Sequence, residues 1–107
     1  MRTVIINRKT WLRGTGKEDS ALRMPNGKKC CIGFLATTLG AKPKQLTGVG
    51  VLEDTSNAIC QDFSSKHYRA LNSAYYENDV RGVIDQDREK SLRHIGKRMD
   101  VRFRFIN

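Results

Sequence analysis

Apolar and charged residues alternate strictly at the C-terminal end of the chain, which reads VRFRFI. Val101, Phe103 and Phe105 occupy every second position, and Arg102 and Arg104 fill the positions between them. Neighbouring side chains of a β-strand point to opposite faces of a sheet. The pattern therefore predicts a strand with one buried face and one solvated face.

A second strand and a long helix are predicted by the same kind of pattern. The β-branched run at residues 3–6 favours a strand near the N-terminus. Residues 85–98 favour a helix, because Leu92, Ile95 and Met99 recur at helical spacing and form an apolar stripe. Its first turn is acidic and its last turn is basic, which suits the helix dipole.

The middle of the chain predicts a further helix after a long loop. Residues 47–62 are rich in glycine and short polar side chains, which is typical of a loop. Ser64 or Ser65 can then cap a helix over residues 66–76.

The longest apolar run of the sequence predicts a buried helix over residues 29–39. Gly40 follows at the position of a C-terminal capping glycine, and Pro43 stands just beyond it. A buried strand is the alternative, because Ile32 is β-branched and Gly33 is a poor helix former.

These elements predict an α+β fold in a single domain that comprises residues 1–107. The strands near the two ends are expected to pair in a small antiparallel sheet, with about three helices packed on one of its faces. A chain of this length can bury a sizeable core without a disulfide or a metal ion.

Positive charge is the strongest feature of the composition. The formal net charge is +9, and the first thirty residues hold eight lysines and arginines against two acids. Such a balance favours acidic partners, either nucleic acid or an acidic protein surface. A protein that is merely basic and has no acidic partner is the alternative. No apolar run approaches the roughly 20 residues that span a bilayer, so a membrane is not an expected partner.

Basic residues gather around the single tryptophan, where Arg8, Lys9, Arg13 and Lys17 surround Trp11. Cations beside an aromatic stacking platform are typical of proteins that bind single-stranded nucleic acid. We therefore predict that these five residues contact a partner or nucleic acid. The alternative is that Trp11 is half-buried and anchors a loop.

Arg102 and Arg104 are the second group of predicted contacts. If the last strand pairs with the first, their side chains would extend the basic patch near the N-terminus. Alternatively, they keep an edge strand soluble.

No pattern in the sequence predicts catalysis, a metal site or a cofactor. Cys30 and Cys31 are adjacent and lack the paired spacing of zinc ligands, so they are predicted to be buried in the core. Neither His67 nor His94 stands at a spacing that would make it a general base for these thiols. A non-enzymatic protein is the favoured interpretation.

Two strings near the N-terminus resemble short accessory proteins encoded by tailed phages and prophages. They are N-R-K-x-W-x-R-G, formed by Asn7, Arg8, Lys9, Trp11, Arg13 and Gly14, and N-G-x-x-C-C-x-G-F-L, formed by Asn26, Gly27, Cys30, Cys31, Gly33, Phe34 and Leu35. This resemblance covers about half of the chain and implies a phage-type protein in the cytoplasm of a bacterial host. It transfers no activity.

The sequence as a whole supports three hypotheses about function. The first is a non-enzymatic binding protein that occupies or inhibits a host macromolecule through a basic surface. By analogy with small phage proteins, that partner would be an acidic or nucleic-acid-associated host protein, such as CRISPR or restriction machinery. The second is direct binding of nucleic acid with little sequence preference. The third is binding of a small phosphorylated or nucleotide signal molecule. The oligomeric state stays open.

Overall fold

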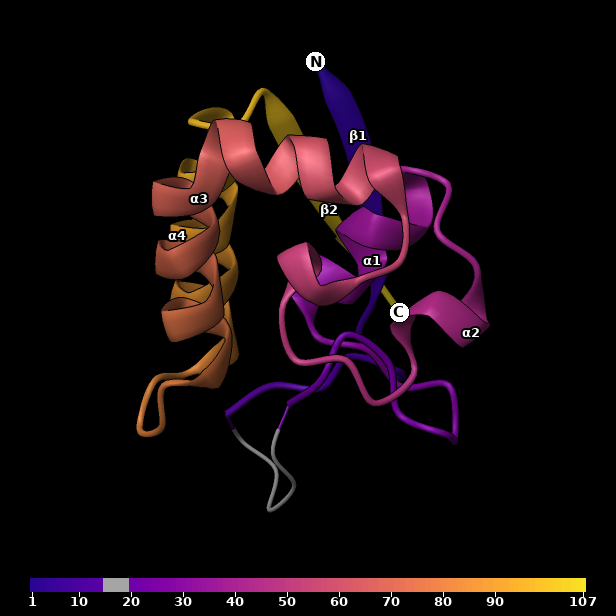
Figure 1. The fold of residues 1–107 in the computed structure, drawn as a ribbon. Helices are drawn as coiled ribbons and strands as arrows, with labels where there is room; N and C mark the ends of the chain where they lie inside the picture. Colours follow the sequence, from indigo (N-terminus) through magenta and orange to yellow (C-terminus); the bar gives the residue numbers. More distant parts are fainter. Residues whose placement is uncertain (15–19) are drawn as a thin grey trace.

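The chain folds into a two-stranded sheet backed by two layers of helices (Figure 1). The computed structural model describes residues 1–14 and 20–107. Its elements in chain order are β1 (Arg2–Asn7), α1 (Cys31–Thr38), α2 (Pro43–Leu46), the 3₁₀ helix η1 (Leu52–Asp54), α3 (Ala58–Asp79), α4 (Asp85–Lys97) and β2 (Val101–Ile106). The predicted α+β class is confirmed, and so is the pairing of the terminal strands.

The two strands run parallel, so the predicted antiparallel sheet is wrong. Arg2 pairs with Val101 at one end of the sheet, where the Arg2 N–H donates to the Asp100 carbonyl at 3.2 Å. An alternating pattern fixes the two faces of a strand but carries no information about its direction. The direction is set by α4, which ends beside the start of β1. Asp100 then turns the chain back with a left-handed backbone, φ 57°.

The helices form two layers, whereas the sequence predicted about three helices against one face of the sheet. Among the described helices, α1 packs against β1 and α4 packs against β2, and the others do not pack on the sheet. The long helix α3 packs on α1 and α4, and has no contact with either strand. The short helix α2 brings the number of α-helices within the described residues to four.

Helix α3 starts earlier than predicted and is bent. It begins at Ala58, where the Asn57 side chain accepts a hydrogen bond from the Cys60 N–H at 3.0 Å. The backbone leaves helical geometry at His67, with φ −129° and ψ 24°. Figure 1 shows the consequence, since the first half of α3 lies across the molecule and the second half runs beside α4. The serines predicted to start the helix thus lie just before this bend.

The core lies between the sheet and the helices. Val4 and Ile6 of β1, together with Val101 and Phe103 of β2, are buried against α1 and α4. The opposite face of the sheet is open to solvent, and Ile5 is 50% exposed there. The predicted division of β2 into a buried and a solvated face is confirmed.

Candidate functional site

Trp11 is buried, so the prediction of an exposed stacking platform is wrong. The residue is only 4% exposed, and its indole N–H donates to Oδ1 of Asn78 at 2.8 Å. The ring also packs against Phe105, with centroids 5.0 Å apart. Trp11 therefore anchors the segment after β1, as the alternative interpretation held, and it is buried more completely than that interpretation expected.

Arg8 and Arg13 are held in internal ion pairs. Nε and Nη2 of Arg8 donate to the two carboxylate oxygens of Glu89 at 2.8 and 2.7 Å. Arg13 grips Asp85 in the same bidentate way at 2.9 and 2.8 Å, and its guanidinium lies over the Trp11 ring. Two parallel charge-assisted bonds are a strong and directional contact. Both arginines therefore tie the N-terminal segment to α4.

These pairs also shift the charge equilibria of their members. The hydrogen bond from Arg13 is the main reason why the pKa of Asp85 lies below its ordinary value. The hydrogen bond to Glu89 raises the pKa of Arg8. Among the other predicted contacts of this group, Lys9 is exposed and Lys17 lies outside the described residues. The predicted N-terminal patch is therefore not brought together as a free cationic surface.

Six exposed cations lie on β2 and on α4 or just after it, and these two elements pack together. We call these cations the α4–β2 basic surface: Lys90, Arg93, Lys97, Arg98, Arg102 and Arg104. Arg93, Lys97 and Arg102 line one hollow, and Lys90 and Arg98 line another. Within the described residues, only Arg93 of these six has an acid within 4 Å, namely Glu89 at 3.9 Å. Arg102 and Arg104 belong to both the predicted and the observed surface.

This surface stays positively charged because the nearby acids are paired with arginines from elsewhere in the chain. Residues 90–107 contain six lysines and arginines and one acid, Asp100, which gives a net charge of +5. The acids just before them, Asp85 and Glu89, are held by Arg13 and Arg8 from the other end of the chain. A count of charges along the sequence locates the excess of positive charge near the N-terminus, because it does not include this long-range pairing.

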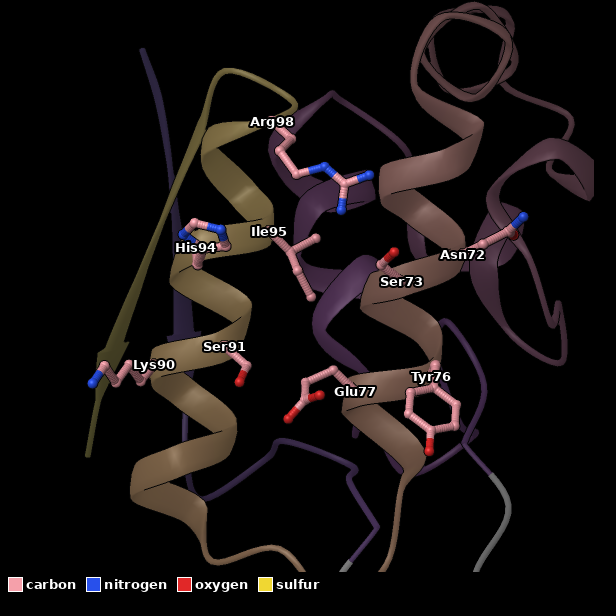
Figure 2. A pocket seen from close by; sticks show the side chains of 9 residues that line it. All are labelled: Asn72, Ser73, Tyr76, Glu77, Lys90, Ser91, His94, Ile95 and Arg98. Carbon is pink, nitrogen blue, oxygen red and sulfur yellow. The ribbon is translucent and has the colours of Figure 1, made fainter.

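A groove with a volume of about 750 Å³ lies beside this surface, between α3 and α4. It is lined by Asn72, Ser73, Tyr76, Glu77, Lys90, Ser91, His94, Ile95 and Arg98. Figure 2 shows Ser91 and Ile95 directed into the space between the helices, and Arg98 reaching toward α3 at one end. Lys90 and His94 extend from the outer flank of α4, and Tyr76 stands at the opposite end from Arg98.

The walls of the groove are fixed by Arg88, a residue whose importance the sequence did not indicate. Its side chain is fully buried, and its guanidinium donates to the carbonyls of Asn78 at 3.0 Å and Val80 at 2.7 Å. These carbonyls belong to the C-terminal end of α3, where backbone acceptors lack helical partners. Arg88 thus joins the end of α3 to the start of α4. An arginine among other charged residues looks like a surface residue, so only the fold reveals this role.

Cys30 and Cys31 are free and buried in the core, as predicted. Cys60, which stands in a stretch predicted to be a loop, is free and buried as well. Burial raises the pKa of Cys30 to about 11, and raises that of Cys31 well above its ordinary value. Since the thiolate is the reactive form, these thiols are poor nucleophiles at neutral pH.

Two further properties of the described residues bear on the kind of site. Within residues 1–14 and 20–107, no group of three or more His, Cys, Asp or Glu side chains is arranged to hold a metal ion. No helix in this part of the chain is long and apolar enough to cross a bilayer.

Comparisons of the chain with protein-family models, with curated proteins and with solved structures found no match. The α4–β2 basic surface and the groove beside it are the features of the molecule that bear on its function.

Proposed function

We propose that this protein acts by binding rather than by catalysis, and that it occupies an acidic macromolecule through the α4–β2 basic surface. The observation that carries this proposal is the set of six exposed cations on adjacent elements, of which only Arg93 has an acid within 4 Å among the described residues. An uncompensated cluster of this kind attracts acidic partners and speeds their encounter.

The proposal includes a biological setting that rests on the two N-terminal strings alone. A phage-type protein in the cytoplasm of a bacterial host would occupy a host macromolecule and block it. The nucleic acid held by host factors such as restriction or CRISPR machinery would supply the negative charge that such a protein binds.

The first test is reversal of three charges. The variant Lys97→Glu/Arg102→Glu/Arg104→Glu removes the centre of the surface without touching an internal ion pair described above. The matched control, Lys28→Glu/Lys44→Glu/Arg69→Glu, has the same net charge but changes exposed cations elsewhere. Tagged forms of both are used to capture partners from bacterial lysate, with and without nuclease.

We expect the first variant to lose its partner by about tenfold or more, because truncated or reversed interface charges weaken both encounter and binding. The control variant should retain the partner, because it has the same net charge as the first variant but keeps the α4–β2 basic surface intact. If the two variants capture the same material in equal amounts, the α4–β2 basic surface is not the interface.

A further inference from the structure

The groove between α3 and α4 is lined by one aliphatic residue and otherwise by residues with polar or charged ends, although apolar atoms make up most of its surface. Ile95 is its buried apolar residue, with 8% of its surface exposed. Ser73 of α3 and Ser91 of α4 line the groove from its two sides. Their side chains are small and leave space that larger side chains would fill. A partner helix would need several apolar anchors along such a groove. The groove offers one aliphatic anchor beside several polar groups, so it suits an occupant that has both apolar rings and polar edges.

Cations and an exposed aromatic ring stand along the same groove. Lys90 of α4 and Arg98 just after it are cations that line the groove, and they lie about 12 Å apart along the helix axis. Tyr76 of α3, at the opposite end of the groove from Arg98, is 70% exposed. Within the lining, Glu77 is the single acid. The groove thus combines two cations with a free stacking surface.

This combination matches the needs of a single nucleic-acid strand. Such strands are bound by cations that follow the phosphates and by aromatic rings on which bases stack. Every base has a π-face, so recognition of this kind tolerates any sequence. An acidic protein segment would use the cations equally well but would give the Tyr76 ring no comparable role.

We propose that the α3–α4 groove binds a single strand of nucleic acid, with one base stacked on Tyr76 and phosphates held by Arg98 and its neighbours on α4. Seryl hydroxyls and the Glu77 carboxylate are then available to the polar edges of the bases. This inference rests on the proposed function, because the groove shares Lys90 and Arg98 with the α4–β2 basic surface. It names the kind of acidic macromolecule that the surface takes.

The test measures binding of a fluorescent oligothymidylate to the full chain by anisotropy. Tyr76→Ala should weaken binding by about 5- to 150-fold, the usual effect of losing one base–aromatic stack. Tyr76→Phe keeps the ring and should bind like the parent protein. Tyr68→Ala is the matched control, because Tyr68 is an exposed tyrosine of the same helix that does not line the groove.

The salt dependence and a second probe separate this inference from the proposed function. Affinity for the oligonucleotide should fall steeply with salt, and less steeply in Arg98→Gln, because fewer counterions would be released. Unaltered binding by Tyr76→Ala overturns the inference. If a polyglutamate peptide of equal charge binds as tightly as the oligonucleotide and is lost on charge reversal of the surface, the inference fails while the proposed function stands. Oligonucleotide binding that survives this charge reversal overturns the proposed function.

Discussion

At the scale of single residues, Asn78 of α3 joins three separate parts of the chain. Its Oδ1 accepts hydrogen bonds from the Trp11 indole at 2.8 Å and from the Cys31 backbone N–H at 3.0 Å. Its Nδ2 donates to the Leu12 carbonyl at 3.0 Å. The buried amide of Asn78, near the end of α3, thereby links α3 to the segment after β1 and to the start of α1. Buried polar groups that lose their partners are costly, so this residue is hard to replace.

We expect Asn78→Ala to lower the free energy of unfolding by about 3 kcal/mol, because it leaves buried donors and an acceptor without partners. Asn72→Ala, an exposed asparagine of the same helix, should change it little. Urea unfolding followed by the fluorescence of Trp11 measures both. Equal stability of the two variants would show that water replaces the lost bonds.

At the scale of the elements, close backbone contacts decide how helix α1 sits in the fold. Gly33 lies in the middle of α1, where a Cβ atom would stand 1.8 Å from the Leu22 carbonyl oxygen. Helix propensity alone would favour alanine there by about 1 kcal/mol. The segment around Leu22 crosses α1 so closely that a methyl group would clash, and this clash outweighs the helix propensity of alanine.

Gly33→Ala should therefore destabilise the protein by about 3 kcal/mol, since backbone must move to admit the methyl group. Gly50→Ala is the control, because no atom lies within 4 Å of a Cβ at that position. Thermal unfolding by circular dichroism compares the two, and a more stable Gly33→Ala would contradict the close contact.

At the scale of the whole molecule, charge links the two ends of the chain. Arg8 and Arg13 follow β1, and their partners Glu89 and Asp85 lie on α4. This pairing fastens the N-terminal segment to the helix. Among the described residues, it leaves most of the later cations of α4 and β2 without an acidic partner, Arg93 excepted. The fold thus separates the paired cations from the exposed ones.

The ion pair between Arg13 and Asp85 predicts how the stability of the protein depends on pH. The folded-state pKa of Asp85 is lowered, chiefly by Arg13, so the stabilisation is present above the unfolded pKa of about 4 and is lost as pH falls through the folded value. Unfolding free energies measured in urea below about pH 5 should fall more steeply for the parent protein than for Asp85→Asn. Asp87→Asn, an exposed acid in the same turn, should keep the parent slope.

Much of the fold could be predicted from local pattern. The alternation in β2 and the stripe of Leu92, Ile95 and Met99 depend on period alone, and all of these apolar positions of α4 and the turn after it are buried. The start of α3 was missed because Asn57 stands in a stretch whose glycines and polar residues indicate a loop. The candidate site was predicted less well, since Arg102 and Arg104 are exposed but Trp11 is not.

The sequence by itself determined the α+β class, the two terminal strands with their faces, the burial of the cysteines and the positive net charge. Each of these depends on composition or on neighbours a few residues away. Only the tertiary structure decided the parallel direction of the sheet, the burial of Trp11 and which cations remain free. These depend on contacts such as Arg8 with Glu89, which lie 81 residues apart in the chain. A local pattern contains no information about contacts over that separation.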